Sequence, residues 1–123
     1  MNPAYETSVF EVKGELSQNF LIITAYNPKG LNAPLSRNLH QDATLKSVLV
    51  NRGLAPVRVT GQSPDGQHQE PGWAVELDLN TGLEIARIFK QLAIYSVENN
   101  LLSLIDCHDA QKVELGDWPS RVI

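Results

Sequence analysis

The chain has 123 residues and is 42% hydrophobic, which is enough for one compact domain with an apolar core. Its formal net charge of −4 and its ten scattered Lys and Arg residues argue against a nucleic-acid-binding surface. No apolar run approaches the roughly 18 residues of a membrane span, no signal peptide is recognisable at the N-terminus, and the single cysteine excludes an internal disulfide. We therefore expect a cytoplasmic protein whose partners include neither a nucleic acid nor a membrane.

The first half of the chain predicts a central strand followed by a helix. Residues 20–26 form a continuous apolar, β-branched run, typical of a strand covered on at least one face, and the turn residues at 27–30 end it. A helix is expected to begin near Ser36 or Asn38, either of which can cap it, and Gly53 is placed to end it in a left-handed conformation. The spacing of apolar residues predicts one buried stripe on this helix, formed by Leu39, Ala43, Leu45, Val48 and Leu49.

The middle of the chain predicts two strands and a second helix. Residues 57–61 and 73–77 alternate between apolar and polar positions, as strands with one solvated face do. Residues 81–84 have the spacing of a capping box, with Leu79 as its staple residue, and open the helix. The buried side of this helix is predicted to carry Ile85, Ile88, Phe89 and Leu92, and the exposed side Glu84, Arg87 and Lys90.

The sequence near the two ends of the chain predicts shorter elements. Residues 93–97 and 101–105 are expected to form a hairpin around a tight polar turn. Residues 8–12 are expected to add an edge strand. Residues 107–123 read as a surface tail, with Trp118 docked on the body of the protein.

The order strand, helix, strand, strand, helix, strand predicts an α+β fold. We expect a ferredoxin-like βαββαβ sandwich, or a close variant, with an added C-terminal hairpin strand. One domain is expected over residues 1–123, with its core at 19–106 and peripheral segments at 1–18 and 107–123. Both helices would cover one face of an antiparallel sheet. This topology brings four segments to one rim: the end of the first strand, the start of the first helix, the end of the second helix and the loop 63–72.

The loop over residues 63–72 carries most of the chemistry in the sequence. His68 and Glu70 form a pair in which the carboxylate can fix the imidazole tautomer and raise its basicity, as in general-base pairs. The simpler interpretation, favoured for His68 taken alone, is a solvated loop whose carboxylates accept backbone N–H groups. Asp65 precedes Gly66 in a common turn pair and is expected to shape the loop.

Several other polar or aromatic residues fall at the predicted rim. Each has an ordinary structural role available, such as capping a turn or satisfying the end of a helix. Their predicted convergence is what favours a ligand site, in which Tyr26 or Trp73 would form an apolar wall. The predicted ligand-binding residues are Thr24, Tyr26, Asn27, Asn38, Asp65, Trp73 and Gln91.

Metal and cofactor chemistry find little support in the sequence. His40, His68 and His108 lack the spacing of a metal site, and the His-x-Glu pair lacks the Pro-Cys-x-x-Cys half of the zinc deaminase signature. There is no Gly-rich nucleotide-binding loop, and no cofactor is predicted. A Ser–His–Asp arrangement stays open, although no Gly-x-Ser-x-Gly elbow is present. Cys107 is expected to be a small apolar residue near the end of a strand.

Taken together, the motifs resemble a bacterial family of short proteins catalogued as domain of unknown function 3293. The resemblance covers about residues 19–106, and the usual pattern has Gly where this chain has Lys90. The family has no assigned activity, so the resemblance implies no mechanism; it implies signature polar positions at Thr24, Asn27, Asn38, Glu70 and Gln91. The residues that carry it are 20–28, Asn38, Gly61-x-x-Pro64-Asp65-Gly66-x-His68-x-Glu70-Pro71-Gly72 and Phe89-Lys90-Gln91-x-Ala93-Ile94-Tyr95.

Three functions remain open from the sequence. The leading hypothesis is a binding module for a small polar molecule, such as a nucleoside, an amino acid or another metabolite, held at the rim pocket. The second is a small hydrolase-type enzyme with Glu70 as general base and His68 as its partner. The third is a protein-interaction domain that forms a homodimer through an apolar sheet face left open by the helices.

Overall fold

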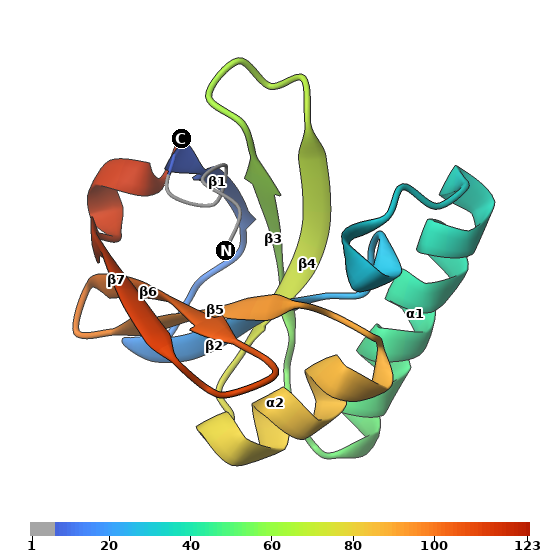
Figure 1. Ribbon diagram of the computed structural model, residues 1–123. Helices are drawn as coiled ribbons and strands as arrows, with labels where there is room; N and C mark the ends of the chain where they lie inside the picture. Colours follow the sequence, from blue (N-terminus) through green and yellow to red (C-terminus); the bar gives the residue numbers. More distant parts are fainter. Residues whose placement is uncertain (1–6) are drawn as a thin grey trace.

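The computed structural model describes residues 7–123, in which two α-helices accompany a seven-stranded antiparallel sheet (Figure 1). The sheet order is β1-β3-β4-β2-β5-β6-β7. The mixed helix and strand content is therefore confirmed, and the sheet is larger than expected. The helices are α1 (Leu35–Asn51) and α2 (Leu79–Ile88), and 3-10 turns η2 (Pro28–Gly30) and η3 (Pro119–Arg121) follow β2 and β7. The strands are β1 (Val9–Lys13), β2 (Asn19–Thr24), β3 (Val57–Gln62), β4 (Gln69–Val75), β5 (Ala93–Glu98), β6 (Leu101–Asp106) and β7 (Lys112–Asp117).

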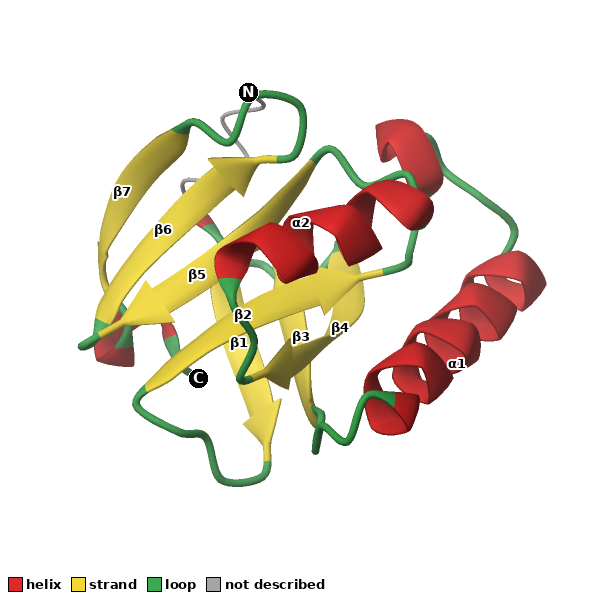
Figure 2. Cartoon of the chain, turned by 90° about the horizontal axis from the view of Figure 1, so that it is seen from below, coloured by secondary structure: helices red, strands yellow, loops and turns green. Residues whose placement is uncertain are grey.

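Both helices pack on the same face of the sheet, as Figure 2 shows. Gly82 allows helix α2 to lie very close to β2. Any residue with a Cβ at this position would collide with Leu21. The apolar side chains of this face come from α1, α2 and strands β2, β4, β5 and β6, and burying them supplies the main stabilisation of the layer. The cluster consists of Leu21, Ile23, Ala25, Leu45, Leu49, Trp73, Val75, Leu83, Ile85, Ala86, Phe89, Ile94, Ile105 and Cys107.

The opposite face of the sheet is also covered, because the sheet curls and the segment after β7 reaches back to β1. Phe10 of β1 forms a bridge with Val122, and the Ile123 N–H donates to the Phe10 carbonyl at 2.9 Å. Trp118 is buried between the rings of Phe10 and Phe20. The expectation of an open apolar face was therefore wrong. Residues 107–123 lie mostly at the surface as expected, and Trp118 docks on the body, but they form the strand β7 and not an irregular tail. Trp118 belongs to a second core on this face, which consists of Phe10, Phe20, Ile22, Val59, Ala74, Val97, Leu102 and Trp118.

Helix α1 begins earlier than its capping residues suggested. It starts at Leu35 after Pro34, and no side chain caps it, so neither Ser36 nor Asn38 is the N-cap. Its buried positions are Asn38, Asp42, Leu45 and Leu49, whereas Leu39 is 53% exposed and Ala43 is exposed. The predicted stripe was thus correct in its C-terminal half and wrong in its N-terminal half, where polar residues take the buried places.

The C-terminal end of α1 follows the prediction. Gly53 has a φ of 80°, a left-handed conformation that suits glycine at a helix end. The Gly53 N–H donates to Val50 and the Leu54 N–H to Leu49, which satisfies the last carbonyls of the helix.

Helix α2 is capped one turn before the predicted capping box. The N-cap is Asp78, whose carboxylate accepts from the Thr81 N–H at 3.0 Å. Ile85 and Phe89 are buried as predicted, but Ile88 is exposed, as is Leu92 after the helix. Ile88 lies on the exposed side of the helix with Glu84 and Arg87, and the helix ends before it reaches Leu92.

The hairpin β3–β4 contains much of the expected loop. Strand β4 begins at Gln69, so the connection is residues 63–68 and Glu70 lies within a strand, opposite Gly61. The hairpin β5–β6 and the edge strand near residues 8–12 are confirmed. Within residues 7–123, no helix is both long and apolar enough to cross a membrane.

Candidate functional site

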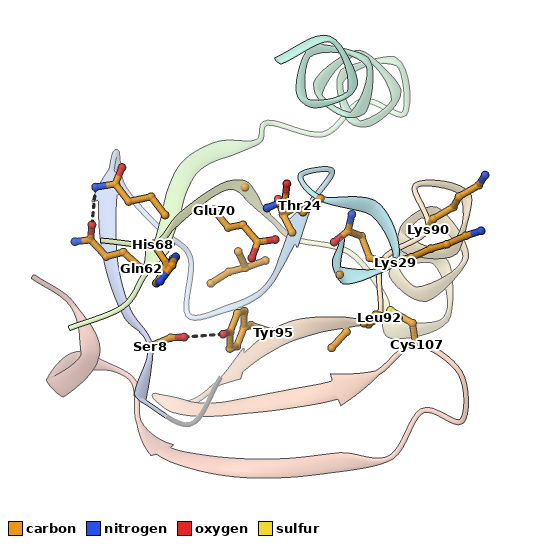
Figure 3. Close-up of a pocket in the computed structure, with 18 of the residues that line it drawn as sticks. Ser8, Thr24, Lys29, Gln62, His68, Glu70, Lys90, Leu92, Tyr95 and Cys107 are labelled. Atoms are coloured by element: carbon orange, nitrogen blue, oxygen red, sulfur yellow. Dashed lines mark hydrogen bonds between the residues drawn. The ribbon is translucent and has the colours of Figure 1, made fainter. Parts of the chain in front are cut away.

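A groove of about 1200 Å³ opens at one end of the curled sheet. Its floor is apolar and includes Phe10, Ile22 and Tyr95, which belong to the second core or pack against it. One end of the groove lies under the β3–β4 hairpin, and the other lies between η2 and the end of α2 (Figure 3). The groove therefore lies at the rim where the sequence placed a site.

Glu70 lies on the wall of this groove. Its side chain is half-buried and its carboxylate is directed into the groove (Figure 3). Burial raises the pKa of Glu70 above its ordinary value of 4.5. No hydrogen bond or ion pair joins this carboxylate to another residue of the described chain, 7–123. Glu70 is thus a desolvated acid that the protein itself leaves without a partner.

His68 also lines the groove but does not pair with Glu70. Its side chain is exposed, and no hydrogen bond connects the two side chains among residues 7–123. The His68 backbone joins the hairpin instead, with its N–H donating to the Ser63 Oγ at 3.1 Å and its carbonyl accepting from the Ser63 N–H. The arrangement of an imidazole oriented by a carboxylate is not formed in this structure.

Asp65 shapes the hairpin loop. Its carboxylate accepts from the Ser63 hydroxyl at 2.6 Å and from the Gln67 N–H at 3.0 Å. These hydrogen bonds, the one from Ser63 first, lower the pKa of Asp65. Asp65 is not part of the groove lining.

Asn27 and Asn38 hold the start of α1 against the end of β2. The Asn27 N–H donates to the Asn38 Oδ1 at 2.9 Å, and the Asn38 Nδ2 donates back to the Asn27 Oδ1 at 2.9 Å. The same Asn27 oxygen also accepts from the Ala33 N–H. Asn27 itself adopts a left-handed conformation, which asparagine tolerates better than most residues. The two amides meet as predicted, but they bind each other and the backbone.

The side chains of Thr24 and Gln91 also form hydrogen bonds with the backbone. The Thr24 hydroxyl donates to the Pro71 carbonyl at 2.7 Å and accepts from the Tyr26 N–H at 3.1 Å. The Gln91 Nε2 donates to the carbonyls of Tyr26 and Phe89 at 3.1 and 3.2 Å. These residues fix the segment after β2 to its neighbours, so they build the wall of the groove.

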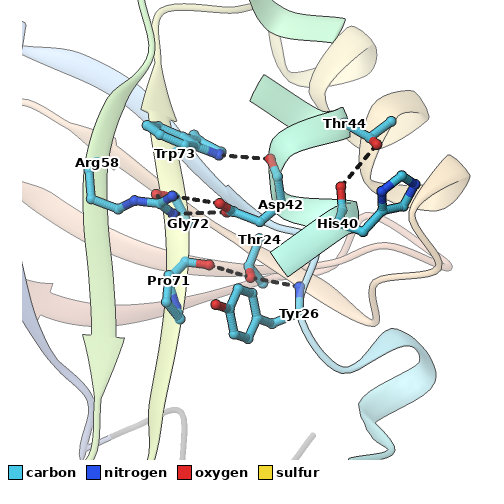
Figure 4. A network of polar contacts seen from close by, with 9 residues as sticks. All are labelled: Thr24, Tyr26, His40, Asp42, Thr44, Arg58, Pro71, Gly72 and Trp73. Atoms are coloured by element: carbon cyan, nitrogen blue, oxygen red, sulfur yellow. Dashed lines mark hydrogen bonds and ion pairs between the residues drawn. The ribbon is translucent and has the colours of Figure 1, made fainter. Parts of the chain in front are cut away.

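Trp73 and Tyr26 lie outside the groove lining. The Trp73 ring packs between α1 and β3, where the Arg58 guanidinium lies 3.7 Å from its centre (Figure 4). Arg58 also binds Asp42 through two hydrogen bonds of 2.8 and 2.6 Å, and the Trp73 Nε1 donates to the Asp42 carbonyl. Burial raises the pKa of Tyr26, and the nearby charge of Asp42 raises it further. Neither aromatic residue forms the predicted wall.

Sequence reasoning missed the Asp42–Arg58 pair. A signal was present, because Asp42 falls on the same helical face as Leu45 and Leu49. A carboxylate on a buried stripe needs a partner. Arg58, on the neighbouring strand, is that partner.

The groove also contains residues that no motif indicated. The Tyr95 hydroxyl donates to the Ser8 Oγ at 3.1 Å across 87 residues of sequence, a contact that only the curling of the sheet creates. Lys29 and Lys90, both left-handed, lie at the far end, where the Lys29 N–H donates to the Lys90 carbonyl at 2.7 Å. Cys107 is buried as expected, and desolvation raises the pKa of its thiol to about 11, so it is a neutral thiol at pH 7.

The described residues contain no group of three or more His, Cys, Asp or Glu side chains that could hold a metal ion. The groove combines one carboxylate without a partner among residues 7–123, an apolar floor, a polar rim and cationic side chains at its far end. These features suit recognition of an organic molecule by a hydrogen-bonding or charged group.

The fold and the groove define a small α/β protein in which a curled antiparallel sheet holds a polar-rimmed groove. A family model matches residues 23–94, more than half of the chain, and its description is "Protein of unknown function (DUF3293)". The chain belongs to this family. No curated protein and no solved structure shows a significant match.

Proposed function

We propose that this protein binds a small polar molecule in the groove, with Glu70 as its anchoring residue. The observation that carries the proposal is the half-buried carboxylate of Glu70, which has no partner among residues 7–123. Leaving a carboxylate desolvated and unpaired costs stability. A ligand that supplies the missing hydrogen-bond donor would recover that cost.

The surroundings of Glu70 support the same proposal. Thr24, Asn27 and Gln91 fix the wall beside it through hydrogen bonds to the backbone, so a ligand would meet a preformed site. The groove volume of about 1200 Å³ leaves room for a metabolite-sized molecule.

We further propose that β2-α1-β3-β4-α2-β5 is a ferredoxin-like unit to which β1, β6 and β7 have been added. The support is the antiparallel order β3-β4-β2-β5 with both helices on one face, which is the order that two interleaved βαβ units produce. In this scheme the added strands curl the sheet and create the groove.

A second candidate function is a hydrolase-type enzyme in which Glu70 acts as general base. Its support is the raised pKa of Glu70, because a base with a pKa closer to neutrality transfers protons more effectively. His68 is not hydrogen-bonded to Glu70, so Glu70 would act without it. In an enzyme of this kind Glu70→Gln abolishes turnover while ligand binding persists.

A thermal-shift screen of nucleosides, amino acids and common metabolites tests the binding function. A ligand present at 100 times its Kd should add about 2.7 kcal/mol to the stability of the folded state. We expect Glu70→Gln to lose the shift and Glu76→Gln, which removes an exposed carboxylate outside the groove, to keep it. The proposal fails if no compound shifts the wild type, or if every shift survives in Glu70→Gln.

A further inference from the structure

We propose that the group recognised at Glu70 is an organic cation, a primary ammonium or guanidinium group carried on an apolar body. The inference rests on the proposed function and names the chemical class of its ligand. It follows from the charges inside the groove and from the surfaces next to Glu70.

The first step concerns charge. Three cationic side chains line the groove, those of Lys29, Arg87 and Lys90, and all lie at the end formed by η2 and α2. The Arg87 Nε is committed to the Cys107 carbonyl at 2.6 Å. Figure 3 shows the side chains of Lys29 and Lys90 extending outward at that end. The other titratable side chains of the groove are those of His68, Asp106 and His108, and none of them is hydrogen-bonded to Glu70 within residues 7–123. The groove therefore presents to its ligand an acid that no lysine or arginine of the described chain neutralises.

The second step excludes other classes of ligand. An anionic group next to Glu70 would meet a like charge in a partly desolvated site, which is unfavourable. A divalent metal ion would need several oxygen ligands, and residues 7–123 offer no group of three suitable side chains. A neutral donor can bind a carboxylate, but a charged donor forms the stronger hydrogen bond and also compensates the buried charge.

The third step concerns the body of the ligand. Phe10, Ile22 and Tyr95 form the groove floor, and the Tyr95 hydroxyl is already bound to Ser8. Figure 3 shows the Tyr95 ring facing Glu70 across the groove. A ligand whose cation reaches Glu70 therefore places its adjoining atoms against apolar and aromatic surface, and an aromatic ring also attracts a cation.

Three probes with the same ring separate the possibilities: benzylamine, benzyl alcohol and benzoate. Each is titrated into the full chain labelled with ¹⁵N, and the affinity is read from the amide shifts of groove residues such as Ile22 and Tyr95. We expect benzylamine to bind about tenfold more tightly than benzyl alcohol, since a charge-assisted hydrogen bond exceeds a neutral one by roughly that factor. Benzoate should not bind at this site.

The variants decide whether Glu70 is responsible. Glu70→Gln should remove the advantage of benzylamine over benzyl alcohol, whereas Glu76→Gln should keep it. Equal affinities of amine and alcohol for the wild type, an amine advantage that survives in Glu70→Gln, or no binding of benzylamine would each overturn the inference. If neutral or anionic compounds from the thermal-shift screen bind in a Glu70-dependent manner, the proposed function stands and the inference alone fails.

Discussion

Glu70 differs from the polar residues around it in the hydrogen bonding of its side chain. Most of the polar residues that the sequence placed at the rim have their hydrogen bonds satisfied within the protein, as Asn27 and Gln91 illustrate. Glu70 has no hydrogen-bond partner for its side chain among residues 7–123, although it lies in a strand of a well-packed sheet. A residue that lowers the stability of the folded state, with no contact that offsets the loss, is a reasonable candidate for function.

The raised pKa of Glu70 predicts a specific pH dependence of stability. The folded state holds this proton more tightly than the unfolded state, so stability falls as the pH rises from the ordinary value of 4.5 through the higher folded pKa. Below that window the penalty is absent, and above it the penalty is complete. Glu70→Gln should therefore be more stable than the wild type at neutral pH, and the difference should vanish under acid conditions.

Urea unfolding at a series of pH values measures this difference. Glu76→Gln, at an exposed position, controls for the loss of one negative charge from an acidic protein. A stability difference between wild type and Glu70→Gln that does not change with pH would contradict the prediction.

Lys90 also lowers the stability of the folded protein, in this case through its backbone conformation. It has a φ of 59° at the left-handed position after α2, where the Lys90 N–H donates to Arg87 and the Gln91 N–H to Ala86. A side chain with a Cβ is strained in this conformation by about 1 kcal/mol, whereas glycine is not. Lys90→Gly should therefore stabilise the protein by about that amount in urea unfolding.

Lys90→Ala is the matched control, because it removes the same long side chain and keeps the Cβ. It should give little or no gain. Equal stabilisation by Gly and Ala would show that the lysine side chain, and not the backbone conformation, carries the cost.

Among the elements, the junction of β2 with α1 depends on one pair of amides. Asn38 is 5% exposed and fastens the first turn of α1 to the end of β2 by binding the Asn27 backbone and side chain. Asn38→Ala leaves the Asn27 N–H without its acceptor, which should cost about 1–3 kcal/mol. Because the two residues act as a unit, a double-mutant cycle with Asn27→Ala should show a coupling of more than about 0.5 kcal/mol.

Ser36 provides the control for this junction. It lies in the first turn of α1, but the helix has no side-chain cap. Ser36→Ala should therefore leave the midpoint of urea unfolding nearly unchanged. A loss of about 1 kcal/mol, the usual value of an N-cap, would show that Ser36 does cap the helix.

Helix α1 is held to the sheet by the Asp42–Arg58 pair and the Trp73 ring. The side chains of Asp42 and Arg58 are 10% and 27% exposed, so their interaction is only partly screened by water. Arg58→Lys keeps the charge but loses the two-pronged contact and the stacking on Trp73, and should cost about 1–2 kcal/mol. Arg37→Lys, on the exposed side of the same helix, should change the unfolding midpoint very little. A similar small effect of both variants would mean that the pair contributes only its charge.

For the whole molecule, the closure of the sheet is the decisive feature. Trp118 is 7% exposed and packs against Phe10 and Phe20, so it joins the two ends of the sheet. Trp118→Ala should cost about 3–5 kcal/mol, as expected for removing a large buried aromatic side chain. Val113→Ala, in β7 but 40% exposed, should cost far less. Comparable losses in the two variants would show that the closure does not depend on Trp118.

The limits of sequence reasoning in this chain follow from the range of the interactions. Local periodicity was enough to predict most elements, and local turn residues such as Gly53 were interpreted correctly. The missed features depend on distant partners. Asp42 occupies a buried position because Arg58 is there, and the tail becomes a strand because β6 offers it an edge. The convergence at the rim was predictable because topology alone determines it. The hydrogen bonds from its amide side chains to the backbone could not be predicted, since they depend on distances of a few ångströms.

The closure also has a consequence for how the chain reaches its native state. The Arg121 guanidinium donates to the Ser8 carbonyl, a contact between residues separated by 113 positions. During synthesis the inner face of β1 cannot be fully covered until residues 118–123 have been made. Until then Phe10 remains accessible to other apolar surfaces. Contacts of such long range slow the search for the native topology, and unpaired strands with exposed apolar groups are prone to aggregate in that interval. The contact between Arg121 and Ser8 should therefore be among the last to form during folding.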